Sequence, residues 1–336
     1  MSLTATIAAL RDSGAVQASD IDGAFAEIMD GGAAHEEIKT FLTLTMPLMG
    51  HAPLIAAGAR ALRSRMVQVA APDGAIDVCG TGGDGAHTLN ISTAVAFVVA
   101  GCGVPVAKHG NRAMSSKSGA ADVLEALGVK LTADLPALER SLREAGVAFL
   151  FAQNHHPAMR HVALVRRELG QRTIFNLLGP LSNPAVVKRQ LMGVFNADFI
   201  EPVAGALKEL GCERAWVVHG AGGLDELSAE HRDANNVAVL DGGAVSVVRA
   251  SAHAEISPDI RGGLAAENAD EMRELLAGRG RSGHRAAVVL NAAAALVVAG
   301  KAADVIEARP MAEHSLDSGA ARGALERLID VTRSAP

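Results

Sequence analysis

From about residue 71 onward, short apolar runs alternate with longer stretches of helical periodicity, and this alternation limits the possible folds more than any other feature. The apolar runs cover residues 76–79, 104–107, 147–151, 215–218 and 237–240. Strands separated by helical crossovers pair in parallel, and the helices then cover the sheet. The sequence therefore predicts an α/β unit with a mostly parallel sheet. Such sheets bind ligands at the carboxyl ends of their strands, so the loops after these runs are candidate sites.

The first 70 residues carry helical patterns and no strand-like run. Ser19 and Asp20 can cap a helix through Met29, and apolar periodicity continues over residues 38–49 and 52–69. A turn cluster follows at residues 72–74. We therefore expect a small all-helical domain over residues 1–70 and a larger α/β domain over residues 71–336.

Composition narrows the classes of function. Lys and Arg number 31 against 37 for Asp and Glu, a net charge of −6, so the chain has no global basic field for nucleic acid. Its three cysteines lack CxxC spacing. No apolar run reaches the roughly 18 residues that cross a bilayer, and the start lacks a signal-peptide pattern. We expect a cytoplasmic protein with neither a membrane nor a nucleic-acid partner.

Glycines dominate the loop after the first apolar run. It reads GTGGDG over residues 80–85, and NIST follows over residues 90–93. Glycine lets backbone N–H groups approach an anion, and the start of a capped helix offers more of them. A glycine turn beside an ordinary helix cap is the competing interpretation. The order of residues fits neither a Walker A loop nor a dinucleotide fingerprint. The pairing of a glycine-rich loop with a capped helix after one strand favours a diphosphate cradle.

Cations and hydroxyls dominate the loop after the second apolar run. It reads KHGNRAMSSKSG over residues 108–119. In a chain of net charge −6, such a focused cluster favours a phosphate-binding flap over a solvated basic loop.

A third segment combines two histidines with several arginines, namely His155, His156, Arg160, Arg166, Arg167 and Arg172. A guanidinium can hold the carboxylate of an aromatic acid through two parallel hydrogen bonds, although most of these arginines are expected to be structural. The histidines have no third ligand at a zinc-like spacing.

Adjacent carboxylates, Asp225 and Glu226, stand in the glycine-flanked loop HGAGGLDELS after the run 215–218. An exposed acidic turn is the common explanation of such a pair. Phosphate-binding loops elsewhere in the chain favour another one, because hard oxygen ligands hold Mg²⁺ jointly with phosphates.

Taken in order, these segments resemble the anthranilate phosphoribosyltransferase family of tryptophan biosynthesis. The resembling blocks are GTGGDG with NIST, KHGNRAMSSKSGAADVLEALG, HHPAM through RTIFNLLGPLSNP, and HGAGGLDELS, which lie between about residues 76 and 230. The resemblance implies a Mg²⁺-dependent glycosyltransferase that moves the phosphoribosyl group of 5-phosphoribosyl 1-diphosphate to the amine of anthranilate. It also implies two Mg²⁺ ions per subunit and a homodimer formed through the helical domain, which helices from about residues 156–186 would join.

The resemblance further implies roles for single residues. The donor would be bound by Gly80, Gly83, Asp84, Thr88, Asn90, Ile91, Ser92, Thr93, Lys108, His109, Gly110, Asn111, Arg112, Ala113, Met114, Ser115, Ser116 and Ala120. The anthranilate pocket would comprise Gly80, His109, Asn111, His156, Arg166 and Gly179. The metal ligands would be Ser92, Asp225 and Glu226, and the catalytic residues would be Lys108, Asn111 and Arg166.

One position departs from the family pattern. The family commonly has SGSAD where this chain has SGAAD, with Ala120 in place of a serine. A hydroxyl contact to the donor is thereby lost, whereas the backbone N–H at the expected helix start is kept. We expect weakened or compensated donor binding and an unchanged reaction.

Two other functions fit part of the pattern. A pyrimidine nucleoside phosphorylase also cleaves at ribose C1, but that family is expected to carry a KHS-type loop where this chain has Lys108-His109-Gly110-Asn111. An inactive relative that binds nucleic acid would be expected to have a positive charge balance and a damaged acidic pair.

Overall fold

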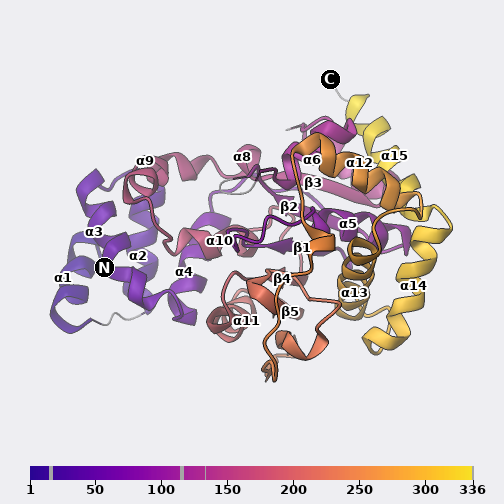
Figure 1. Cartoon of the computed structure of the whole chain (residues 1–336). Helices are drawn as coiled ribbons and strands as arrows, with labels where there is room; N and C mark the ends of the chain where they lie inside the picture. Colours follow the sequence, from indigo (N-terminus) through magenta and orange to yellow (C-terminus); the bar gives the residue numbers. More distant parts are fainter. Residues whose placement is uncertain (15–17, 114–116, 133, 335–336) are drawn as a thin grey trace.

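The computed structural model describes residues 1–14, 18–113, 117–132 and 134–334. Figure 1 shows a smaller helical lobe that holds the N-terminus and a larger lobe in which helices surround a sheet. The expected fold class, a helical N-terminal region followed by an α/β unit, is confirmed. No helix of the described residues is long and apolar enough to cross a membrane.

Amphipathic helices form the smaller lobe. They are α1 (Leu3–Ser13), α2 (Ala18–Met29), α3 (His35–Thr45), the short 3₁₀ turn η1 (Met46–Leu48) and α4 (Ala52–Arg63). Their apolar faces meet around Phe25, whose ring stands edge-on to that of Phe41 with centroids 5.3 Å apart. Helix α1 was not among the expected elements, although Ser2 caps it through its hydroxyl.

The helix expected over residues 52–69 ends earlier, at Arg63. Beyond it the backbone N–H of Val67 donates to His155, and that of Val69 donates to Pro184. The Val69 side chain is buried against Leu138 and Leu142 of α7 (Leu135–Glu144). These tertiary contacts outweigh the helical propensity of the segment.

Seven strands form one sheet in the order β3-β2-β1-β4-β5-β6-β7. Their bounds are β1 Ile76–Gly80, β2 Val106–Gly110, β3 Val147–Phe151, β4 Arg189–Gly193, β5 Arg214–His219, β6 Asn236–Asp241 and β7 Ala244–Val248. The first five strands in this order are parallel, and β6 and β7 add an antiparallel hairpin. Its two-residue turn, Gly242-Gly243, has positive φ at both positions, which suits glycine.

Two large hydrophobic clusters cover the sheet. One joins it to α5 (Ile91–Gly101), α6 (Ala120–Leu127), α12 (Ala265–Leu276), α13 (Ser282–Val298), α14 (Val305–Asp317) and α15 (Ala320–Arg333). The other joins it to α11 (Ile200–Glu209) and to the helical lobe, through α9 (Arg160–Leu169) and α10 (Phe175–Leu181). The short elements are α8 (Ala152–His155) and the 3₁₀ turns η2 (Pro157–Met159), η3 (Ala197–Phe199), η4 (Ala221–Gly223), η5 (Arg232–Ala234) and η6 (Pro258–Ile260). The helical lobe therefore shares its core with one face of the sheet.

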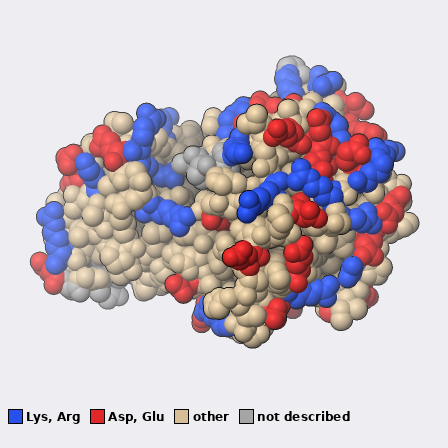
Figure 2. Space-filling view, viewed as in Figure 1, with Lys and Arg blue, Asp and Glu red and all other residues tan. Residues whose placement is uncertain are grey.

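Charge is distributed without a dominant sign over the face in Figure 2, where basic and acidic side chains are interspersed on the larger lobe. Much of the helical lobe in this view carries uncharged side chains.

Candidate functional site

The carboxyl ends of β1, β4 and β5 meet the loop that carries Asp225 and Glu226. The Asp225 carboxylate accepts a hydrogen bond of 2.7 Å from the backbone N–H of Gly82. A Cβ atom on Gly193, at the end of β4, would collide with the backbone oxygen of Asp225, and one on Gly80 would collide with its carboxylate. A Cβ on Gly220 would collide with the backbone oxygen of Glu226. Glycine is required at these three positions, here called the glycine cradle, because the acidic loop passes so close.

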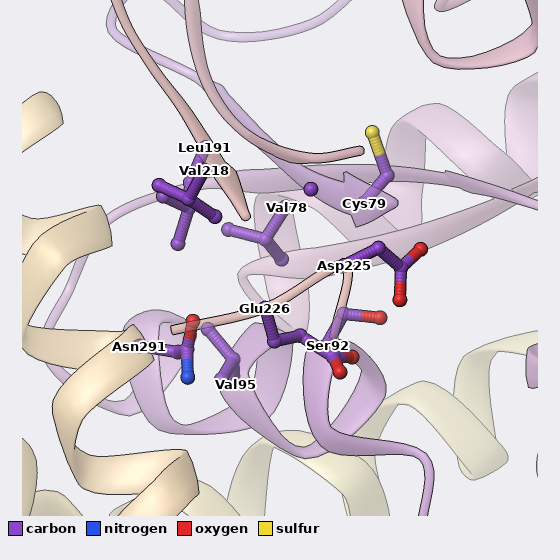
Figure 3. A pocket seen from close by; sticks show the side chains of 10 residues that line it. Val78, Cys79, Ser92, Val95, Leu191, Val218, Asp225, Glu226 and Asn291 are labelled. Atoms are coloured by element: carbon purple, nitrogen blue, oxygen red, sulfur yellow. The ribbon is translucent and has the colours of Figure 1, made fainter. Parts of the chain in front are cut away.

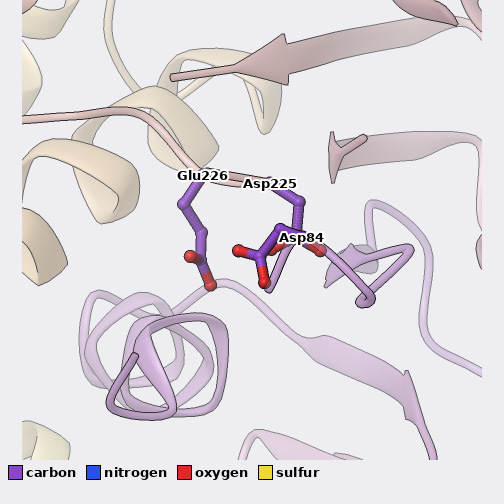
Figure 4. Close-up of side chains that lie close together, drawn as sticks. All are labelled: Asp84, Asp225 and Glu226. Carbon is purple, nitrogen blue, oxygen red and sulfur yellow. The ribbon is translucent and has the colours of Figure 1, made fainter. Parts of the chain in front are cut away.

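Three carboxylates converge in this place. Oxygen atoms of Asp84, Asp225 and Glu226 lie within 4.8 Å of one another, and Figure 4 shows the three side chains directed toward a common point. We call them the acidic cluster. The sequence placed Asp225 and Glu226 at a metal and Asp84 only at the donor, so the structure adds a carboxylate to the expected set.

Burial and mutual repulsion disfavour ionisation in the acidic cluster. Burial raises the pKa of Asp225 to about 7, and the charge on Asp84 adds to the effect. Burial and then the charge on Asp225 raise the pKa of Glu226 well above its usual value. The buried Oε2 of Glu226 has no hydrogen-bond partner among the described residues. Hard oxygen donors, repelling charges and an unpartnered oxygen fit a divalent cation such as Mg²⁺.

A small cavity extends beneath the acidic cluster. Its polar lining consists of Ser92, Asp225, Glu226 and Asn291, and Figure 3 shows Ser92 beside Glu226. The Asn291 amide accepts from the N–H of Leu227 and donates to its carbonyl, both at 2.9 Å. Asn291 therefore holds the backbone next to Glu226. Sequence reasoning missed it because it lies in the Ala-rich helix α13, which was interpreted as packing alone.

The Lys108 side chain is directed into the protein, toward β1 and the start of α5, and not toward solvent. Its ammonium donates to Val78 O at 2.7 Å and to Ser92 Oγ at 3.2 Å, and the residue is 3% exposed. Burial lowers its pKa, whereas the negative charges of Asp77, Glu226 and Asp225 oppose the shift. The Asp77 carboxylate accepts from the N–H of His109. Lys108 thus supplies a buried positive charge below the ligand loops.

The loop between β1 and α5 is held from several sides. Arg172 donates to the carbonyl of Gly83, and its guanidinium lies 4.2 Å from the centroid of the Phe195 ring. Thr88 forms an antiparallel bridge with Arg261. At the start of α5, the hydroxyl of Thr93 is buried and lacks a partner among the described residues. Asn90 stands at the N-terminal end of α5, where Ser92 is half-buried and Ile91 is buried.

The flap is described at its two ends, because the expected donor residues Met114, Ser115 and Ser116 lie outside the described residues. Arg112 is engaged by α6, where it pairs with Asp122 at 2.8 Å and Glu125 at 2.6 Å. Asn111 is exposed, and its side-chain oxygen accepts from the N–H of Arg112 at 2.8 Å. The other described flap positions on the donor list, Gly110, Ala113 and Ala120, are all half-buried, and Ala120 is the first residue of α6, as expected.

Two histidines meet on the other side of the β2 loop. The Nε2 atoms of His109 and His156 lie 3.2 Å apart, and His109 Nδ1 lies 3.0 Å from the carbonyl of Gly179. A carbonyl only accepts, so His109 donates from Nδ1, and its Nε2 then accepts from the Nε2–H of His156. This leaves the buried Nδ1 of His156 as an acceptor without a partner among the described residues.

Both members of this histidine pair are neutral near pH 7. Burial, then the neighbouring His156, places the pKa of His109 well below its usual value. Burial, then His155, lowers the pKa of His156 to about 4. Neutral, hydrogen-bonded imidazoles suit the ring of an aromatic ligand better than charged imidazoles would.

Arg166 contacts the same helix as the histidine pair. Its guanidinium lies 5.7 Å from the centroid of the Phe175 ring, and Phe175 and Gly179 are one turn apart on α10. Burial lowers the pKa of Arg166. No carboxylate of the described residues pairs with it, so a half-buried cation is available to an anionic ligand.

Comparison with known proteins agrees with this arrangement. Residues 72–322 match the model of the glycosyl transferase family, a/b domain. The chain is 48% identical to an anthranilate phosphoribosyltransferase from Parvibaculum lavamentivorans over 97% of this chain and 96% of that one. Two solved structures of anthranilate phosphoribosyltransferases are similar. That from Thermus thermophilus has a TM-score of 0.89 with 38% identity over 99% of both chains. That from Saccharomyces cerevisiae, in complex with PRPP and Mg, has a TM-score of 0.88 with 26% identity over 99% of this chain and 98% of that one.

Proposed function

Because the chain belongs to the anthranilate phosphoribosyltransferases of the glycosyl transferase family, we propose that its acidic cluster and histidine pair hold the two substrates of that reaction. The enzyme transfers the phosphoribosyl group of 5-phosphoribosyl 1-diphosphate to the amine of anthranilate. The products are N-(5-phosphoribosyl)anthranilate and diphosphate, in the biosynthesis of tryptophan.

The observation that carries the assignment of sites is the contrast between the two walls at the carboxyl edge of the sheet. One wall combines three carboxylates with a glycine loop and a helix start. The other combines a neutral histidine pair with an arginine that has no carboxylate partner among the described residues. The first fits a diphosphate held with a cation, and the second fits an aromatic carboxylate.

On the donor side, the backbone N–H groups of the glycine loop and of the α5 start would bind the diphosphate. Asn90 and Thr93 offer side-chain donors there, and the buried Lys108 contributes positive charge from below. Departure of diphosphate leaves positive charge on the ribose, as in glycoside chemistry, so holding the leaving group in place favours the transition state.

On the acceptor side, Arg166 would hold the carboxylate of anthranilate while the histidine pair borders its ring. The aryl amine is neutral, so positioning it in line with the ribose can lower the barrier by several kcal/mol without a general base. Asn111 stands in the flap beside this pocket and is proposed to contact both substrates.

Mg²⁺ fits the oxygen donors of Asp84, Asp225, Glu226 and Ser92, and we propose two ions per subunit. A bound cation would offset the negative charge that accumulates on the departing diphosphate.

Three further proposals follow from the family. The helical lobe, with residues 1–70 joined by helices from about 156–186, is proposed to form a homodimer, which the 55% exposure of Leu164 on α9 supports. The catalytic α/β domain is assigned to residues 71–336. A cytoplasmic location is supported by three cysteines that are all free thiols.

The test of function mixes the protein with anthranilate, 5-phosphoribosyl 1-diphosphate and Mg²⁺ and follows the loss of anthranilate fluorescence. Loss that requires both the donor and Mg²⁺ is expected. Phosphate-dependent cleavage of pyrimidine nucleosides, without any use of anthranilate, would instead identify a nucleoside phosphorylase.

A further inference from the structure

Asn268 lies outside every segment so far assigned to the site, yet it contacts two of the ligand loops. It is the fourth residue of α12 and is 2% exposed. Its Nδ2 donates to Asn90 Oδ1 and to Ser118 Oγ, both at 2.9 Å. One buried amide thereby joins the start of α5 to the C-terminal end of the flap.

The orientation of the Asn268 amide is fixed by a group that can only donate. The backbone N–H of Gly263 points at Asn268 Oδ1 with a distance of 2.7 Å. An N–H requires an oxygen opposite it, so Nδ2 must face the other way. Both of its hydrogens are then used, one on Asn90 and one on Ser118.

This orientation passes to Asn90. Since Asn268 presents N–H, Asn90 turns its Oδ1 toward Asn268 and keeps Nδ2 on the opposite side of its own amide. No acceptor of the described residues takes a hydrogen bond from Asn90 Nδ2. The NH₂ group is therefore directed by the protein to donate to a ligand, and a flipped amide would offer an oxygen to an anionic ligand instead.

The backbone supports the same arrangement. Leu89 N–H donates to Ile260 O and Gly262 N–H donates to His87 O, both at 2.8 Å. A Cβ on Gly262 would lie 2.5 Å from the carbonyl oxygen of Thr88, so the segment 260–262 passes against the loop at the closest possible distance. Asn268 closes this short ladder at its end.

We propose that Asn268 is a positioning residue for the phosphoribosyl diphosphate, which acts by fixing the Asn90 amide so that its NH₂ group faces the donor. The proposal rests on the function proposed above. It assigns to α12 a role in donor affinity and none in the binding of anthranilate.

The experiment measures the affinity for 5-phosphoribosyl 1-diphosphate with Mg²⁺ by calorimetry, in the absence of anthranilate, for four proteins: wild type, Asn268→Ala, Asn90→Ala and the double variant. Each single change is expected to weaken donor binding by about tenfold, the effect of one lost hydrogen bond to a charged ligand. Because Asn268 acts through Asn90, the double variant should bind the donor about as well as Asn90→Ala alone. Two effects that multiply in the double variant would overturn the proposal.

Two further variants distinguish the proposed positioning role of Asn268 from a purely structural role. Ser315→Ala removes a buried hydrogen bond of 2.8 Å to Val98 O, two turns inside α5, and should lower thermal stability without a selective loss of donor affinity. Asn268→Asp keeps the acceptor for Gly263 and replaces the donating NH₂ by oxygen. Asn268→Asp should lower the affinity for the donor at least as much as Asn268→Ala does. The KM for anthranilate at saturating donor should stay within about twofold of the wild-type value. Donor affinity equal to wild type in both Asn268 variants contradicts the proposal, and if Asn268→Asp does not fold, Asn268→Ala decides alone. Failure of the wild-type protein to bind the donor would instead contradict the proposed function.

Discussion

The acidic cluster and the histidine pair stand at the same edge of the sheet, but one gathers like charges and the other consists of neutral side chains. Asp225 and Glu226 lie close to Asp84, and burial together with neighbouring carboxylate charge raises the pKa of both, so a bound cation would favour the ionised form of this wall. Burial keeps His109 and His156 neutral, and hydrogen bonds to each other and to Gly179 fix their orientation, so this wall needs no cation. The contrast indicates that changes on the acidic wall should act on metal and turnover, whereas changes on the histidine wall should act on the acceptor and on stability.

The largest effect is expected from Asp225→Asn combined with Glu226→Gln. Turnover should fall by about 10³-fold or more, because a lost metal ion removes several kcal/mol of transition-state stabilisation. Stability without Mg²⁺ should hold or rise, since buried like charges are removed. Fluorescence assays over a Mg²⁺ series and thermal melts measure both quantities.

The matched control is Asp198→Asn with Glu201→Gln, which removes two exposed carboxylates near α11. It should leave turnover unchanged. Normal activity of the Asp225/Glu226 double variant at low Mg²⁺ would make that pair an ordinary acidic turn.

The second prediction concerns Arg166→Ala on the opposite wall. Loss of a charged hydrogen bond to the anthranilate carboxylate should lower the affinity for anthranilate by roughly 10- to 100-fold. Donor affinity should change little. Calorimetry on each ligand checks the difference, with Arg167→Ala on the exposed side of α9 as the control. Equal losses for both ligands in a folded protein would show that Arg166 is structural.

The third prediction uses acid to disturb the histidine wall and a histidine variant to isolate its share of the effect. His156 has its folded pKa lowered from 6.5 to about 4, so the unfolded chain binds the proton first as the pH falls. Its contribution to stability is therefore present above pH 6.5 and declines between about pH 6.5 and 4, by up to about 3 kcal/mol. Urea unfolding at pH 7 and pH 4.5 should show a smaller loss in His156→Gln than in wild type.

His314→Gln, an exposed histidine change on α14, is the control for this experiment and should keep the acid sensitivity of wild type. Identical pH dependence in His156→Gln and wild type would mean that the histidine pair does not stay neutral in the folded protein.

The smallest effect is expected from Ala120→Ser at the first turn of α6. The added hydroxyl would supply the donor contact that the family resemblance implies, while the backbone N–H at this helix start is already present. Donor affinity should rise by no more than about tenfold, the value of one hydrogen bond, with KM for anthranilate unchanged. Steady-state kinetics at fixed anthranilate measures it, and a fall in donor affinity would mean that the chain has adapted its flap to alanine.

The sequence predicted the architecture well where signals were local. Apolar runs located five strands, and their order along the chain predicted a mostly parallel sheet. Strand β4 was missed because its apolar core, residues 191–192, is short and flanked by Arg189 and Gln190. Strand β7 was missed because it alternates at an exposed edge with Val248 62% exposed.

The candidate site was predictable in its ligand-facing residues and not in their supports. Residues in glycine-rich or charged loops have unusual composition, so they are visible in one sequence. Asn268 and Asn291 stand within ordinary helical patterns, and nothing near them in the chain indicates that their amides hold Asn90 and Leu227. Lys108 was visible as a cation, but its direction toward Val78 depends on how β1 and β2 pair.

The glycine cradle of Gly80, Gly193 and Gly220 has a consequence for the genetic history of this chain. Every other amino acid carries a Cβ, and a Cβ at any of the three positions would meet the acidic loop. Every amino-acid substitution at those three positions should therefore disturb the acidic cluster. Random mutagenesis under selection for tryptophan prototrophy should therefore retain glycine at these three positions. The exposed Gly242 and Gly243 of the β6–β7 turn should instead tolerate replacement by asparagine or aspartate.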